Sequence, residues 1–184
     1  MRRTLRTLAC LVFIAAAAVD LAATTARRLT NEQMADTADI IVIGRVTDVR
    51  AVWENPRTLV TVATVSVSER LKGDVGDTVT VALPGGADAN RRFPVAVTYA
   101  GAPQMREGED VFLFLSRDGE IASGLTVLGF SQGKFSIVDD GKGGKAVSRD
   151  LTQVTLVGGT GAVRGAVTLV GLAEFKQEIL EYLR

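Results

Sequence analysis

Apolar and polar residues alternate along most of the chain, and this pattern predicts a mainly β protein. Residues 38–46 form a continuous, largely β-branched apolar run, which is typical of a strand buried on both faces. Residues 58–71 and 78–83 alternate with a period of two, as strands with one buried face do. The apolar positions of 58–71 change parity partway along, so we expect a β-bulge near Ala63 and Thr64.

The second half of the chain carries shorter strand signals. Residues 111–115 are all apolar and predict a strand in the centre of the sheet. Further strands are expected at about 126–130, 134–138 and 145–148, and the glycine-rich residues 140–144 predict a turn before the last of them.

A short helix is expected before the first of these strands. Thr30 and Gln33 have the spacing of a capping box, in which each side chain accepts a hydrogen bond from the other residue's backbone. The sequence therefore predicts a helix over residues 31–37, directly before the apolar run 38–46.

The C-terminal segment, residues 158–184, combines the signals of a linker and of a helix. Gly158, Gly159 and Gly161 predict a flexible linker. A phosphate-binding P-loop is disfavoured, because no lysine follows these glycines in the required spacing. After them, apolar residues at positions 172, 175, 179 and 183 recur as on one helical face and predict an amphipathic C-terminal helix.

Residues 84–106 interrupt the strand pattern. They contain several glycines and prolines, and only 93–99 within them have the pattern of a short strand. Insertions of this length in a compact domain are uncommon and often functional, so we expect this one to contact a ligand. The candidate contact residues are two adjacent arginines, two aromatic residues and a methionine, namely Arg91, Arg92, Phe93, Tyr99 and Met105.

The first 26 residues have the three parts of an export signal. Three arginines near the start precede an apolar core at 8–19, and small residues follow at 22–26. Cleavage fits after Ala26 or after Ala23. The core is shorter than the roughly 20 residues of a membrane-spanning helix, so export to the periplasm or out of the cell is favoured over the alternative, a membrane anchor.

Removal of this signal leaves about 158 residues, the size of one ordinary domain. The full chain has 21 basic and 21 acidic side chains. The signal contains three of the basic and one of the acidic side chains, so the mature net charge is −2. Proteins that bind nucleic acid usually have a strong basic excess. We therefore expect no nucleic-acid partner.

The chain has no histidine, and its single cysteine, Cys10, lies within the export signal. A mature protein without imidazole or thiol groups forms no Ser-His or Cys-His catalytic pair, no disulfide and no ordinary zinc site. We therefore expect no catalytic residues, no cofactor and no metal, and no stable membrane span once the signal has been removed.

The acidic residues give only weak signals for metal binding. Asp139 and Asp150 have the spacing of the first and last ligands of a calcium loop, but glycines occupy its third and fifth positions, so a hairpin turn is favoured. Glu107, Glu109 and Asp110 crowd one turn, where we expect solvated carboxylates rather than a metal site.

A Ser-Lys catalytic pair would draw on Ser131, Lys134 and Ser136. Strand alternation places Lys134 and Ser136 on one exposed face, where such pairs are routine. Carboxylate-dependent hydrolysis needs two acids held at a set separation in a cleft, and the sequence identifies no such pair.

The order of these signals resembles that of netrin-like modules and of the tissue inhibitors of metalloproteinases. The resemblance covers about residues 36–138. It lies in Ala38-Asp39 before an apolar strand with Gly44-x-Val46, in Leu71-Lys72-Gly73 after the second long strand, and in Gly108 shortly before a Phe/Leu strand. It implies a five-stranded OB-type barrel. A set of uncharacterised exported bacterial proteins is also similar over most of the mature chain.

The metalloproteinase inhibitors bind the catalytic zinc of their target through an N-terminal cysteine that disulfides hold in place. In this chain Arg27 or a nearby small residue stands where that cysteine would be. The resemblance therefore implies the barrel and not zinc chelation. Inhibition of a protease through another surface stays open.

Together these signals predict a mainly β protein with an OB-like barrel over residues 27–157, an insertion at 84–106, a short N-terminal helix and an amphipathic C-terminal helix. The expected function is noncatalytic binding of a protein or cell-surface ligand by an exported module. The alternatives are a carboxylate-dependent hydrolase and a structural component of the envelope or matrix.

Overall fold

The computed structural model describes residues 24–117, 124–158 and 161–184. Within these residues the chain is mainly β, as expected, and has two helices, α2 (Asn31–Thr37) and α3 (Leu172–Tyr182). The strands are β1 (Thr24–Arg27), β2 (Ile40–Asn55), β3 (Thr58–Lys72), β4 (Thr78–Pro84), β5 (Gly86–Asp88), β6 (Val95–Val97), β7 (Asp110–Ser116), β8 (Leu125–Val127), β9 (Lys134–Asp139), β10 (Lys145–Asp150), β11 (Val154–Gly158), β12 (Gly161–Arg164) and β13 (Val167–Gly171).

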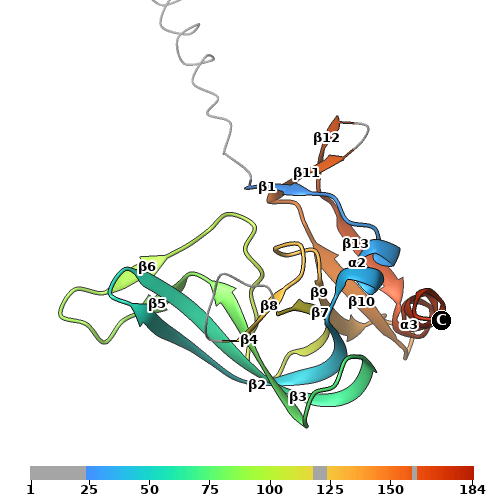
Figure 1. The fold of residues 1–184 in the computed structure, drawn as a ribbon, viewed down its shortest axis with the longest axis horizontal. Helices are drawn as coiled ribbons and strands as arrows, with labels where there is room; N and C mark the ends of the chain where they lie inside the picture. The colour runs from blue at the N-terminus through green and yellow to red at the C-terminus, as the bar shows by residue number, and fades with distance from the viewer. Residues whose placement is uncertain (1–23, 118–123, 159–160) are drawn as a thin grey trace, which may run out of the picture.

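Eight of the strands form one sheet in the order β13-β10-β9-β7-β2-β3-β4-β8 (Figure 1). Strand β8 also pairs with β7, so the hydrogen-bonded neighbours β7, β2, β3, β4 and β8 return to β7 in a ring of five strands. Neighbours in the ring are antiparallel except for β4 and β8, which are parallel. One parallel pair is required, because a ring with an odd number of strands cannot reverse direction at every step.

One core cluster is built from the strands of this ring. Successive side chains of a strand point to opposite faces, and alternate residues of these strands are buried together. The members are Ile40, Val42, Val46, Ala63, Val65, Val79, Val81, Leu83, Met105, Val111, Leu113, Leu115 and Val127. Apart from Met105, each of them lies on β2, β3, β4, β7 or β8.

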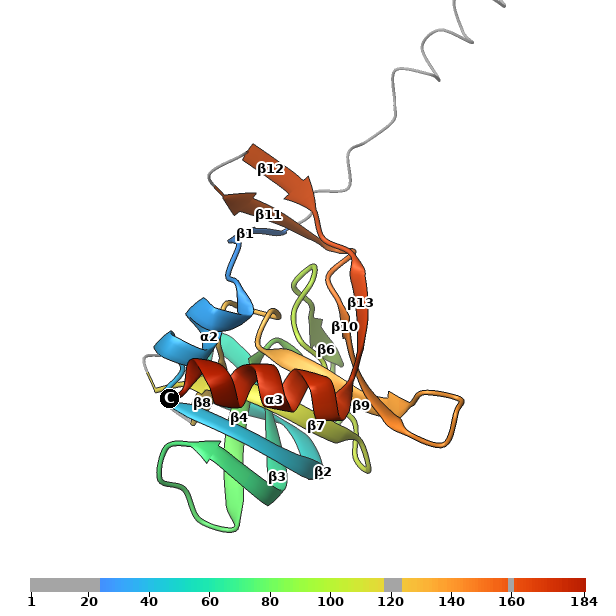
Figure 2. The ribbon, with the colours of Figure 1, turned by 90° about the vertical axis from the view of Figure 1, so that its right-hand side faces the viewer.

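The second core cluster lies on the other face of β2 and β7, where both helices pack (Figure 2). Four phenylalanine rings form its centre, with centroids 4.7 to 6.5 Å apart: Phe112, Phe114, Phe135 and Phe175. Met34 of α2 and Ile179 of α3 are fully buried against this group. Because β2 contributes to both clusters, its first residues are buried on both faces, as their continuous apolar run predicts.

Both expected helices are present, and local signals explain their ends. The hydroxyl of Thr30 accepts a hydrogen bond from the backbone of Gln33 at 3.1 Å, and the Gln33 side chain accepts one from the backbone of Thr30 at 3.1 Å. This reciprocal pair is the predicted capping box. In α3, Phe175 and Ile179 are buried on one face, which confirms the amphipathic C-terminal helix.

At the register shift beside Ala63 and Thr64 the additional residue lies in β2, not in β3 as the parity change suggested. Val46 faces Val65 and Asp48 faces Thr64, so Thr47 is the additional residue. The hydroxyl of Thr47 donates to the backbone oxygen of Thr64 at 3.2 Å. The expectation at Ala63–Thr64 was therefore wrong about the strand. A parity change shows that two strands slip relative to each other and does not show which one holds the additional residue.

The glycine-rich stretch before α3 is not a linker where the structure describes it. Residues 154–158 and 161–164 pair as the hairpin β11–β12, and β13 then pairs with β10 in the large sheet. Residues 159 and 160 lie outside the described residues. A Cβ at Gly165 would lie 2.2 Å from the backbone oxygen of Leu151, so glycine is needed here for close packing rather than for flexibility.

The insertion 84–106 contains a two-stranded sheet of β5 and β6, and we call residues 85–99 the β5–β6 arm. The expected strand within 93–99 is present as β6, whereas β5 was missed because its sequence Gly-Ala-Asp consists of residues that are depleted in strands. Figure 1 shows the arm at the end of the long β2–β3 hairpin, on the side of the molecule away from α2 and α3.

Most of the expected export signal, residues 1–23, lies outside the described residues. Its last three residues, 24–26, form β1 together with Arg27. Strand β1 runs parallel to β11, with Thr24 opposite Val154 and Arg27 opposite Val157. In the described part of the chain, no helix is long and apolar enough to cross a membrane.

Candidate functional site

A hydrogen bond and a stacked guanidinium fix the β5–β6 arm to strand β2. The indole Nε1 of Trp53 donates to Asp88 Oδ2 at 2.8 Å. Arg91 lies 4.0 Å over the Trp53 ring, and its Nε is 3.4 Å from Asp88 Oδ2. At the base of the arm, the hydroxyl of Thr61 donates to the backbone oxygen of Gly85 at 2.8 Å. The arm is therefore held at both ends of β5.

The carboxylate of Asp88 is the centre of this arrangement. The hydrogen bond from Trp53 and then that from the backbone of Asn90 hold the pKa of Asp88 below its usual value, and Arg91 adds to the effect. These three groups all favour the charged form of Asp88.

Four of the five predicted contact residues lie on the arm, and two of them are prominently exposed. Phe93, in the loop between β5 and β6, is 74% exposed, and Tyr99, just after β6, is 52% exposed. The guanidinium of Arg92 lies 5.6 Å from the centre of the Phe93 ring. Arg91 is already engaged with Trp53 and Asp88, so it supports the arm as well as facing solvent.

The fifth predicted contact residue, Met105, lies in the core. Its side chain is 5% exposed and packs with the cluster that contains Val111 and Leu113. Met105 also lines a hollow beside Tyr99, but it does not share the exposure of Phe93, and its role as a contact residue stays a prediction. Proline and glycine around residues 101–106 obscured this position, because one buried side chain in a loop has no periodicity to reveal it.

A polar cavity of about 360 Å³ lies between the segment 101–106 and strands β9 and β10. Lys134, Ser136 and Glu109 form a hydrogen-bonded group in its wall. Lys134 Nζ donates to Ser136 Oγ at 2.7 Å, and Ser136 Oγ donates to Glu109 Oε1 at 2.6 Å. The Lys134 and Glu109 side chains are only 14% and 19% exposed, so the expectation of an open strand face was wrong.

The two acids that line this cavity are both held in the charged form. Burial raises the pKa of Glu109, but hydrogen bonds from Lys134, Ser136 and the Arg106 backbone outweigh burial and hold it below its usual value. Backbone and hydroxyl bonds from Thr152 lower the pKa of Asp150. Glycoside hydrolysis by paired carboxylates needs one acid with a raised pKa as proton donor. Neither Glu109 nor Asp150 has such a raised pKa.

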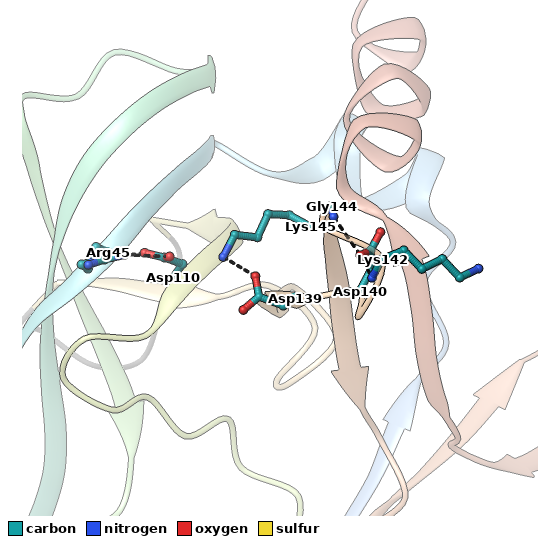
Figure 3. Close-up of polar contacts among 7 residues, drawn as sticks. All are labelled: Arg45, Asp110, Asp139, Asp140, Lys142, Gly144 and Lys145. Atoms are coloured by element: carbon teal, nitrogen blue, oxygen red, sulfur yellow. Dashed lines mark hydrogen bonds and ion pairs between the residues drawn. The ribbon is translucent and has the colours of Figure 1, made fainter.

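The three acids of the turn at 107–110 do not gather at one point. Glu109 turns into the cavity, whereas Asp110 forms a bidentate ion pair with Arg45 at 2.7 and 2.9 Å. Figure 3 shows Lys145 beside this pair, with its own bond to Asp139 at 2.7 Å. The hydrogen bond from Arg45, followed by the charges of Arg45 and Lys145, keeps the pKa of Asp110 low.

Residues 139–150, which have the spacing of a calcium loop, form the β9–β10 hairpin, as expected. Asp140 Oδ1 accepts from the backbone of Lys142 at 2.7 Å and of Gly144 at 2.9 Å (Figure 3). These bonds close the turn and lower the pKa of Asp140. Over the described ranges, no group of three or more acidic or thiol side chains is placed to hold a metal ion.

No protein-family model matches this sequence, and a search of the curated proteins finds none that matches it. The resemblance to netrin-like modules therefore stays a prediction. Any functional assignment rests on the arm, the polar cavity and the charges around them.

Proposed function

We propose that this protein is an exported, noncatalytic binding module that holds a protein ligand with its β5–β6 arm. The observation that carries the proposal is the high exposure of Phe93 on an arm that is itself fixed to the body of the protein. Aromatic residues are enriched at protein interfaces, and a phenylalanine held exposed on an arm that is fixed in place is suited to such a contact.

The composition of the arm suits a protein ligand. Aromatic residues and arginine are the residues that most often dominate binding free energy at protein interfaces. Phe93 and Tyr99 supply apolar area, and Arg92 beside Phe93 supplies a charge and hydrogen-bond donors. Because Trp53 and Asp88 already order the arm, little conformational entropy would be lost on binding.

The fold that we assign to the ring of five strands is an OB-like barrel. Support comes from the number of strands, from the single parallel pair of β4 and β8, and from the shared core on one face of the ring. OB-type barrels bind their ligands with the loops that join their strands. In this chain the arm arises in the connection between β4 and β7, two strands of the ring.

Export through the N-terminal signal is part of the same proposal, and cleavage after Ala23 fits the fold better than cleavage after Ala26. Cleavage after Ala23 leaves all of β1, residues 24–27, paired with β11. Cleavage after Ala26 would remove three of its four residues and the hydrogen bond from the Thr24 hydroxyl to Ala100.

The proposal is tested by capture of partners from the native exported fraction with the purified mature protein. The matched variants are the double substitution Phe93→Ala with Tyr99→Ala, and Leu169→Ala, which removes an exposed apolar side chain from β13. We expect the Leu169→Ala variant to recover the same protein as the wild type and the double variant to lose it. Equal recovery by all three would contradict the arm as the contact surface.

A further inference from the structure

Arg149 on β10 is a largely buried cation for which the described residues provide no anionic partner. Its Nη1 donates to the backbone oxygen of Gln132 at 3.0 Å, and its guanidinium lies 4.5 Å from the centre of the Phe135 ring. Its Nε is buried and has no hydrogen-bond partner among the described residues. No carboxylate of those residues forms an ion pair with it.

Such an arrangement is costly for the protein alone. Buried charges in proteins are usually paired, because removal of an ion from water is expensive unless an opposite charge compensates. Burial, followed by repulsion from Arg28, lowers the pKa of Arg149 to about 10. The side chain is still positively charged at neutral pH, so an opposite charge would stabilise it.

Gln132 holds the two arginines near each other. It is almost completely buried, and its side chain accepts from the backbone of Leu29 at 2.9 Å and donates to that of Arg27 at 2.7 Å. These bonds fix the segment that carries Arg28, while the backbone oxygen of Gln132 holds Arg149. The repulsion between the two cations is therefore built into the fold and is not relieved by movement of a loose terminus.

Arg28, Gln132 and Arg149 line a hollow of about 620 Å³, and so does Arg164 at the end of β12. Arg149 lies between this hollow and the polar cavity described above, because it lines both. Two acids, Glu32 and Glu178, lie on its wall, so the three arginines leave an excess of one positive charge. Glu178 Oε1 already accepts hydrogen bonds from the side chains of Asn31 and Tyr182, each at 3.1 Å. The positive charges come from three separate parts of the chain.

We propose that this hollow binds an oxyanion, a phosphate, sulfate or carboxylate group, through Arg149, Arg28 and Arg164. A planar guanidinium donates parallel hydrogen bonds to two oxygens of such a group, and several arginines around one anion are the usual recognition chemistry. The site lies on the side of the molecule with β1, β12 and β13, away from the β5–β6 arm (Figure 1). The hollow is therefore a separate surface from the contact proposed for the arm.

Isothermal titration calorimetry of the mature protein tests this site, with inorganic phosphate, sulfate and acetate as three separate ligands and with ionic strength held constant by sodium chloride. We expect saturable one-to-one binding of at least one of them, and the strongest ligand identifies the class of group that the site prefers. The absence of saturable binding for all three would overturn the proposal.

Three variants separate specific binding from general charge effects. Arg149→Gln should abolish the binding, and Arg164→Gln, at an exposed position that is not needed for the core, should weaken it at least tenfold. Arg57→Gln removes an exposed arginine from the β2–β3 turn and should leave the affinity unchanged. An equal loss in the Arg57→Gln and Arg164→Gln variants would show nonspecific screening and would contradict the site.

Discussion

The indole Nε1 of Trp53 donates a hydrogen bond to Asp88 Oδ2 at 2.8 Å, and this bond joins the β5–β6 arm to the long strand β2. The two residues are 35 positions apart in the sequence, and the guanidinium of Arg91 lies over the Trp53 ring. The arm is thus a fixed projection of the fold, and its exposed aromatic residues are presented in a defined position.

Substitution of Asp88 by Asn should loosen the arm and leave the rest of the fold intact. The amide keeps the shape of the side chain but loses the charge that strengthens the bonds from Trp53 and Arg91. Hydrogen exchange should become faster at the paired residues Ala87 and Ala96 and stay unchanged in β7. Asp48→Asn, which removes an exposed carboxylate of β2, is the control. Unchanged exchange in the arm of the Asp88→Asn variant would show that this bond does not hold it.

Acid should release the arm, because the pKa of Asp88 is lowered by the bonds that brace it. The stabilisation from Asp88 is complete above its unfolded pKa of about 4 and is lost as the pH falls through the lower pKa of the folded protein. Trp53 is the only tryptophan of the chain, so its fluorescence reports this transition. The Asp88→Asn variant should lack the transition, and identical pH curves for both proteins would argue against this origin.

Alanine substitutions at Phe112 and at Phe93 should have very different effects on the free energy of unfolding. Phe112 is fully buried, with its ring centroid 5.1 Å from that of Phe175, so Phe112→Ala should lower the free energy of unfolding by about 3–5 kcal/mol. Phe93→Ala removes an exposed side chain and should change it by no more than about 0.5 kcal/mol. Urea denaturation measures both. A large loss of stability in Phe93→Ala would mean that Phe93 supports the fold and is not free to contact a ligand.

Alanine substitutions at Gly165 and Gly158 test whether this segment is a packed hairpin or a flexible linker. A Cβ at Gly165 would lie 2.2 Å from the Leu151 backbone oxygen, so Gly165→Ala should destabilise the protein by about 1–3 kcal/mol. At Gly158 the nearest atom to such a Cβ is 3.7 Å away, on Arg28, so Gly158→Ala should change stability by less than about 1 kcal/mol. Thermal or urea unfolding is the measurement. If both variants unfold like the wild type, the segment does not pack as described.

The parts of the fold that sequence could predict depend on local or periodic signals. Successive residues of a strand point to opposite faces, so the continuous apolar run at the start of β2 predicts burial on both faces. The capping box at Thr30 and Gln33 joins residues three apart, so its spacing is visible in the chain. The amphipathic face of α3 repeats over several turns for the same reason.

The remaining features depend on contacts between distant residues. Sequence shows glycines at 158–165 but not that Gly165 lies against Leu151. It places Lys134 and Ser136 on one strand face but does not show that segment 101–106 lines a cavity with that face. The missed position with the greatest functional interest is Arg149. Strand alternation places it on the same face of β10 as the buried Val147, and that placement was the one available signal.

The dissociation constant of the captured protein partner tests most directly whether the β5–β6 arm is the contact surface. It should be measured for the wild-type protein, for Phe93→Ala and for the Leu169→Ala control, after urea denaturation has shown that all three are equally stable. We expect Phe93→Ala to bind at least tenfold more weakly, a loss of about 1.4 kcal/mol or more, and Leu169→Ala to bind like the wild type. Equal dissociation constants for the wild type and Phe93→Ala would contradict the proposed role of the arm.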